Sequence, residues 1–182
     1  MNHLMRSLIV LVLGGALVAC TPAPETSPTP VPPTPSVTPT PTPQWTAEEQ
    51  GAIDGVNHYL EVWAHVSQNL ADISWTALYE VAREPAYNEA YDVWETWYHN
   101  GWHLVGAPTF TATMIQPGMR DGQGQRYWVY GCYDISDAHL MDKDGKLLNN
   151  DGGDTHRAKY QVLSLNNGRH LVLEDSQQEG TC

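Results

Sequence analysis

The side chain best suited to covalent chemistry is the thiol of Cys20, which stands at the end of an apolar run near the start of the chain. His3 and Arg6 make the start weakly basic, and an apolar core of about ten residues runs from Leu8 to Leu17. A transmembrane helix needs about 20 apolar residues, so this core is too short to span a bilayer. It predicts an export signal instead, residues 1–19, that is removed from the mature protein.

The segment Leu17-Val18-Ala19-Cys20 resembles the lipobox of bacterial lipoproteins, in which a leucine, two small or β-branched residues and a cysteine follow one another. The resemblance implies cleavage before Cys20, a diacylglyceryl thioether on its sulfur, and acylation or exposure of the new N-terminus. Two or more acyl chains such as palmitate, at about 0.8 kcal/mol per buried methylene, would make a stable anchor. A chance cysteine in a signal peptide is the alternative. We expect a protein anchored by lipid to the extracytoplasmic face of the cell membrane.

If Cys20 carries lipid, Cys132 and Cys182 remain as a pair in an oxidising compartment. Such a compartment favours a disulfide between them. The bond would close a loop of about 50 residues and contribute about 4 kcal/mol by the chain-entropy estimate. Two free thiols are the alternative, and a metal site fits less well because no CxxC spacing is present.

The remaining groups that could hold a metal ion are weaker candidates. His99 and His103 are four residues apart, but Gly101 between them is expected to end a helix. Asp142-Lys143-Asp144-Gly145 shares only part of a calcium-loop pattern, so a plain turn is favoured. The segment 149–154 is acidic and glycine-rich and is expected to be a solvated loop. We expect no metal ion and no cofactor.

The charge of the chain restricts its partners. Lysine and arginine number 9 against 21 acidic residues, for a formal net charge of -12, and loss of Arg6 with the signal makes the chain more acidic still. Binding to nucleic acid or to anionic headgroups requires basic patches, so we expect neither. The acidity is typical of a protein that stays soluble outside the cell.

Residues 20–44 comprise the lipidated cysteine and a linker of almost only Thr, Pro, Ser, Val and Ala. Proline fixes φ and removes amide donors, so this segment is expected to be extended. At about 3.1 Å per residue it could reach roughly 70 Å. It would hold a single folded domain, residues 45–182, away from the lipid.

The folded domain is predicted to begin with helices. Thr46 and Glu49 form a capping-box pattern ahead of an apolar stripe, which predicts a helix over 47–70. A helical turn is expected over 75–82, and the next helix over 85–101, with proline at its start and glycine at its end.

Beyond residue 101 the apolar spacing becomes that of strands. Strands are predicted over 103–114, with a turn at Pro117-Gly118, and then over 126–135, 155–165 and 170–175. Hairpin turns are expected at Asp144-Gly145 and Asn166-Asn167-Gly168. Helices followed by antiparallel strands predict an α+β domain.

This element order over residues 45–182 resembles the cone-shaped NTF2-like domains, in which helices precede a curved antiparallel sheet. Gly131-Cys132-Tyr133-Asp134, Asp142-Lys143-Asp144-Gly145-Lys146 and the segment from Gly168 to Cys182 are similar to small actinobacterial lipoproteins whose last cysteine bonds back to the sheet. A cystatin-like roll would share the order. The resemblance implies N-terminal helices packed on a curved antiparallel sheet, and a fold alone does not carry a function.

The aromatic residues of the predicted helices could line a cavity for an apolar ligand: these are Tyr87, Tyr91, Trp94, Trp97, Tyr98 and Tyr59. Packing beneath the sheet is the alternative for the same side chains. His58 and Asp134 are candidate polar groups of such a cavity.

Three functions are compatible with these features. The first is a non-catalytic domain that binds a ligand or an envelope protein, and we favour it. The second is an NTF2-like isomerase or dehydratase with an acid–base residue in the cone, and the third is a structural spacer. GxSxG, GxGxxG, phosphate-loop and HExxH motifs are absent from the sequence, so no catalytic residue is assigned. A buried carboxylate with a raised pKa in a pocket would favour the enzyme. The oligomeric state is left open.

Overall fold

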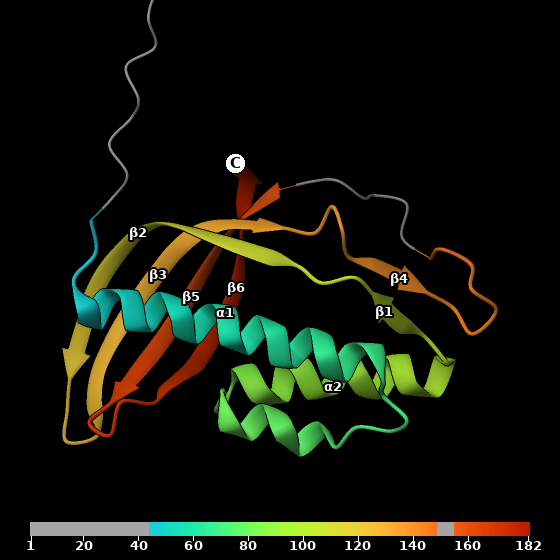
Figure 1. Cartoon of the computed structure of the whole chain (residues 1–182), viewed down its shortest axis with the longest axis horizontal. Coiled ribbons are helices and arrows are strands. Elements are labelled where there is room, and N and C mark those ends of the chain that lie inside the picture. Colours follow the sequence, from blue (N-terminus) through green and yellow to red (C-terminus); the bar gives the residue numbers. More distant parts are fainter. Residues whose placement is uncertain (1–43, 149–154) are drawn as a thin grey trace, which may run out of the picture. The chain divides into compact units, whose positions relative to one another are not determined.

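In the computed structural model, which describes residues 44–148 and 155–182, the helices come first and the strands follow (Figure 1). The helices pack on one side of a curved sheet whose strand pairings are all antiparallel. The predicted α+β class is therefore confirmed.

Helix α1 (Ala47–Gln68) begins at the predicted capping box. The Thr46 hydroxyl accepts a hydrogen bond from the Glu49 amide at 3.3 Å, and the Glu49 carboxylate accepts one from the Thr46 amide at 2.8 Å. These bonds satisfy two amides that an uncapped helix leaves without partners. The helix ends two residues before the predicted limit, with Asn69 as its C-cap.

Two glycines of α1, Gly51 and Gly55, face the sheet and have no side chains to hold it away. A Cβ atom at Gly55 would lie 2.6 Å from Cβ of His170, and one at Gly51 would lie 2.7 Å from its Nε2. The His170 ring bonds to Ser164 across the hairpin of strands β5 (Thr155–Leu165) and β6 (His170–Thr181), with 2.8 Å between Nδ1 and Oγ. The absence of side chains at both positions thus lets the helix approach this hairpin closely.

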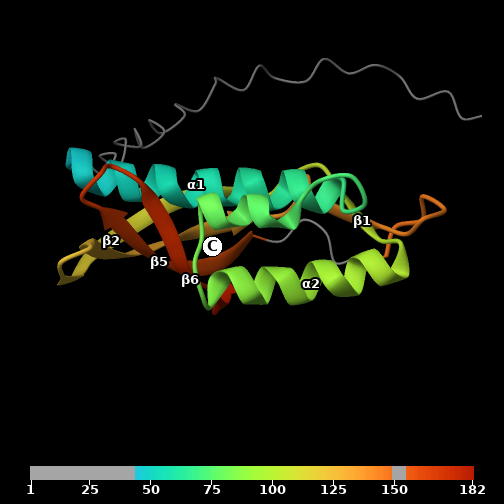
Figure 2. The same ribbon diagram turned by 90° about the horizontal axis from the view of Figure 1, so that it is seen from below.

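The short 3-10 helix η1 (Trp75–Glu80) and helix α2 (Ala86–Asn100) follow as predicted. Gly101 ends α2 at φ 67° and donates its amide to the carbonyls of Trp97 and Tyr98. A left-handed C-cap of this kind favours glycine, so the predicted stop is confirmed. The short helix η1 contacts both α1 and α2, and in the view of Figure 2 it is drawn between them.

The main sheet has the order β2-β3-β5-β6. Its strands are β2 (Thr109–Arg120), β3 (Gly124–Asp134), β5 (Thr155–Leu165) and β6 (His170–Thr181). The predicted turn at Pro117-Gly118 is wrong, because β2 continues through both residues and Pro117 pairs with Tyr127. An edge strand tolerates proline, since half of its amides face away from the ladder. Strand β6 also extends six residues beyond the predicted limit of 175.

A second, two-stranded sheet pairs β1 (His103–Val105) with β4 (His139–Met141). The single strand predicted over 103–114 is therefore divided between two sheets, and Gly106 and Pro108 lie at the division. After β4 the Asp142 carboxylate accepts the amides of Asp144 and Lys146 at 2.9 and 2.8 Å. These bonds close the predicted turn.

The hydrophobic core lies between the helices and the inner face of the main sheet. Val129, Val162 and Val172 of the sheet are fully buried, as is Trp94 of α2. The Trp94 indole donates to the Ser67 hydroxyl of α1 at 2.8 Å, which gives this buried ring a polar partner. Within the described ranges, no helix has both the length and the apolar character needed to cross a bilayer.

Candidate functional site

Several predicted features lie outside the described residues. They are the signal at 1–19, the lipid attachment site Cys20, the linker up to residue 43 and the loop 149–154. These remain predictions from the sequence.

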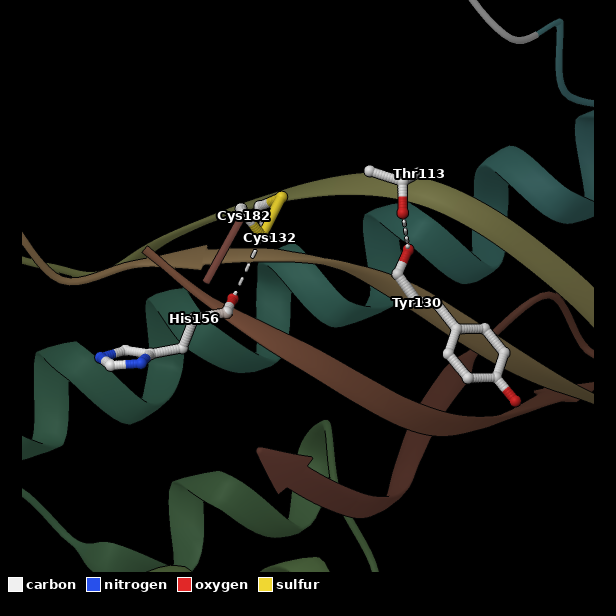
Figure 3. Close-up of a disulfide and its surroundings, with 5 residues drawn as sticks. All are labelled: Thr113, Tyr130, Cys132, His156 and Cys182. Atoms are coloured by element: carbon white, nitrogen blue, oxygen red, sulfur yellow. Dashed lines mark hydrogen bonds between the residues drawn. A yellow bond between two sulfur atoms is a disulfide. The ribbon is translucent and has the colours of Figure 1, made fainter. Parts of the chain in front are cut away.

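The predicted Cys132–Cys182 disulfide is present, with the two Cα atoms 5.9 Å apart (Figure 3). It ties the end of the chain, beyond β6, to β3, so it reaches across β5. The Cys182 amide also donates to the Thr155 carbonyl of β5 at 3.3 Å. A hollow of about 710 Å³ lies beside the bond, between Thr113 and Arg157. The candidate site lies elsewhere, where a smaller cleft brings a carboxyl and buried tyrosines together.

The aromatic residues predicted to line a cavity do not gather around one space. Tyr87 and Trp94 are buried in the core, and Trp97 packs edge-on against Trp63 at 5.7 Å between ring centroids. Tyr91 and Tyr98 are exposed and pack edge-on against the Trp75 ring. The spacing of apolar residues along a helix shows which face is buried. It does not show whether that face packs in a core or lines a cavity, because both give the same spacing.

The sixth of these residues, Tyr59, does line a cleft of about 300 Å³ between the two helices and the sheet. The cleft, which we call the Asp175 cleft, has a buried floor that includes Tyr59 and Tyr160. Its rim includes the exposed side chains of Glu89, Val93 and Gln177. The other lining residues are Leu60, Trp63, Ala90, Tyr133 and Asp175.

Asp175 of β6 is the chemically distinctive group of the cleft. Burial raises the pKa of its carboxyl to about 6, hydrogen bonds from Tyr59 and Tyr160 lower it, and the nearby Glu89 raises it. The Tyr59 hydroxyl donates to Oδ2 of Asp175 at 3.3 Å. A carboxyl of this kind can hold or release a proton near neutral pH.

Three tyrosines surround this carboxyl from different elements. Tyr59 comes from α1, Tyr133 from β3 and Tyr160 from β5. Burial, followed by the Asp175 charge, raises the pKa of each hydroxyl above its usual value. All three therefore stay protonated at neutral pH and can donate hydrogen bonds into the cleft.

Three residues of the cleft were not predicted from the sequence: Asp175, Tyr133 and Tyr160. Two of them had the period of two as a signal, because side chains two apart on a strand share a face. Tyr133 continues the inward alternation of Val129 and Gly131, and Tyr160 stands between the buried Ala158 and Val162. Asp175 had no such signal. A register shift in β6 makes Leu173 an extra residue, so Asp175 faces inward three residues after the fully buried Val172 rather than two.

The two polar residues proposed for the cavity lie elsewhere. The Asp134 carboxylate accepts the Ser136 amide at 2.8 Å, and that bond lowers its pKa. His58 is exposed beside Glu61, with 3.5 Å between Nδ1 and Oε2. Neither residue lines the Asp175 cleft. Asp134 serves a turn, and His58 lines a separate, open hollow that also includes Asp54 and Arg169.

The described residues bring together no cluster of three or more His, Cys, Asp or Glu side chains that could hold a metal ion. His99 is exposed at the end of α2, and His103 begins β1 beyond the Gly101 cap. Asp142 uses its carboxylate to close a turn, and this bonding to the Lys146 amide lowers its pKa.

Comparisons with known proteins add little about function. No family model matches the chain, and a search of the curated proteins finds no match. Among solved structures, the crystal structure of the intermembrane space region of the chloroplast protein ARC6 is similar at 15% sequence identity, with a TM-score of 0.47. The alignment covers 76% of this chain and 100% of that one. A likeness of this size carries no functional conclusion, so the Asp175 cleft is interpreted from its own geometry.

Proposed function

We propose that the chain is a bacterial lipoprotein, anchored through Cys20 to the extracytoplasmic face of the cell membrane, whose NTF2-like domain binds a small ligand in the Asp175 cleft. The observation that carries ligand binding is the half-buried Asp175 carboxyl among three tyrosine hydroxyls, in a cleft with an exposed rim. Polar groups that converge in a partly apolar cleft are typical of ligand sites. The lipobox-like segment supports the anchor, and the disulfide is consistent with an oxidising compartment.

The anchor is tested by Cys20→Ser in a bacterial host. The variant has no thiol to carry diacylglyceryl. In a detergent phase separation we expect it in the aqueous phase rather than the detergent-rich phase. We also expect that it incorporates no labelled palmitate. Cys182→Ser is the matched control, since it removes a cysteine outside the lipobox and should keep both signals. A Cys20→Ser protein that still carries palmitate would exclude this anchor.

Ligand binding is tested by native mass spectrometry of the full chain, extracted gently from its own envelope. We expect a bound mass that Val93→Trp displaces, because a tryptophan at this exposed rim position would occupy the cleft. Glu95→Trp is the control, since Glu95 is exposed on the same helix and does not line the cleft. An empty wild-type protein, or a bound mass that Val93→Trp leaves unchanged, would contradict binding at this site.

Acid–base catalysis is the second candidate function, and the raised pKa of Asp175 favours it. The same extraction in deuterated buffer separates the two functions. A general base that removes a carbon-bound proton would leave deuterium on carbon in the recovered ligand, and Asp175→Asn would prevent this exchange. A ligand recovered without carbon-bound deuterium supports binding alone.

A further inference from the structure

The charged side chains that line the Asp175 cleft are all acidic. Its lining contains two carboxyl groups, on Asp175 and Glu89, and no lysine, arginine or histidine. Two basic residues directly precede lining residues in the sequence, and both point away from the cleft. His58, before Tyr59, is exposed beside Glu61. Lys159, before Tyr160, lies on the opposite face of the sheet, where its Nζ is 4.0 Å from the Trp128 ring centroid and 3.3 Å from Glu174. The protein therefore supplies negative charge to the cleft without a matching cation among the lining side chains.

Aromatic rings form much of the wall around these carboxyls. Tyr59, Tyr133, Tyr160 and Trp63 all line the cleft. Neighbouring rings hold three of them in place: Tyr59 and Tyr160 pack edge-on at 6.3 Å between centroids, Phe110 packs on Tyr160 at 5.1 Å, and Trp97 packs on Trp63. The faces of such rings attract cations, and most strongly when water is excluded.

The size and polarity of the cleft restrict the ligand further. A volume of about 300 Å³ is at the lower end for ligand sites, so it suits a small molecule better than an acyl chain. An apolar ligand would remove the Asp175 carboxylate from water without compensating its charge, which is unfavourable. An anion would face two like charges.

We propose that the Asp175 cleft binds a small organic cation, a primary or quaternary amine, with Asp175 as its charge partner and the tyrosine and tryptophan rings as its walls. This inference rests on the proposed ligand-binding function and names the class of ligand. Glu89 at the rim adds long-range attraction as the amine enters.

Binding of a cation to this site should depend on pH. The groups that face Asp175 are Tyr59 of α1, Glu89 of α2, Tyr133 of β3 and Tyr160 of β5. The tyrosines stay neutral because their pKa values are raised, so Asp175, with its pKa of about 6, is the group expected to govern binding between pH 5 and 7.5. Since the cation favours the ionised carboxylate, binding should release a proton, and the affinity at pH 5 should be about tenfold below that at pH 7.5.

The test is isothermal titration calorimetry of the full lipidated chain in a neutral detergent, at fixed ionic strength. Tetramethylammonium and methylammonium chloride are the cationic probes, and tert-butanol is a neutral probe of similar size. We expect at least one cation to bind at least tenfold more tightly than tert-butanol, with the pH dependence given above. Asp175→Asn should weaken that binding at least tenfold, whereas the matched control Asp134→Asn, outside the cleft, should leave it unchanged.

The other outcomes contradict the proposed cation binding, and they show whether ligand binding in the cleft fails with it. If tert-butanol binds as tightly as the cations, or if Asp175→Asn binds the cation normally, the inference fails while ligand binding in the cleft stands. If no cation binds but native mass spectrometry finds a ligand that Val93→Trp displaces, the ligand is not an organic cation and the proposed function survives. If no cation binds and the extracted protein is empty, both fail.

Discussion

Replacing Asp175 with asparagine should stabilise the folded domain at neutral pH by up to about 3 kcal/mol. Burial raises the pKa of this carboxyl from 3.8 to about 6, so the folded state binds its proton more tightly than the unfolded state does. Below pH 3.8 the carboxyl is protonated in both states, and its stability relative to asparagine is then fully retained. That stability is lost as the pH rises from 3.8 through about 6, above which the ionised group destabilises the fold by its full amount. Asparagine keeps an oxygen that can accept the Tyr59 hydroxyl and carries no charge.

The measurement is urea unfolding of both proteins from pH 4 to pH 8. The difference in unfolding free energy should be largest at pH 7.5 and should shrink toward zero near pH 4. His170 also makes stability depend on pH, because burial lowers its pKa and the fold loses stability as the pH falls below 6.5. Both proteins contain His170, so comparing their unfolding free energies at the same pH removes its contribution. Asp134→Asn is the control of opposite sign, since hydrogen bonding to Ser136 lowers the pKa of Asp134. An Asp175→Asn variant less stable than wild type at pH 7.5 would contradict the burial argument.

Breaking the Cys132–Cys182 bond should lower the free energy of unfolding by about 4 kcal/mol. The bond closes a loop with a sequence separation of 50, and the entropy of the unfolded chain rises when that loop opens. The last residues of β6 should also exchange their amide protons faster, because the bond joins this chain end to β3.

The disulfide prediction is checked by urea unfolding with and without a reductant. The double variant Cys132→Ser, Cys182→Ser is the control, and the reductant should have no further effect on its stability. If reduction leaves the wild-type midpoint unchanged, the bond contributes little and the loop-closure argument does not apply to this chain.

The local features of the fold could be predicted from the sequence because each depends on residues close together in the chain. The Thr46–Glu49 capping box, the Gly101 stop and the turns near Gly145 and Gly168 all follow from backbone chemistry within a few residues. The turn expected at Pro117 was wrong, since whether a strand tolerates proline depends on its place at the edge of the sheet.

The composition of the candidate site could not be predicted in the same way. Tyr59, Tyr133, Tyr160 and Asp175 come from four elements and meet only after the sheet curves around the helices. The raised pKa of Asp175 depends on burial by these partners, which no local pattern reports. The aromatic face of α2 was visible in the sequence, but its use in core packing rather than in one cavity depended on the position of α1 and η1.

The central claim is that Asp175 is a buried carboxyl that binds an organic cation. A carbon-13 NMR titration of its side-chain carboxyl tests this most directly. The signal is assigned as the resonance that disappears in Asp175→Asn. We expect a midpoint near pH 6 in the free protein, which falls when a saturating organic cation is added. A midpoint near 3.8 that the cation leaves unchanged would show that the carboxyl is solvated, and would contradict both the cleft and its ligand.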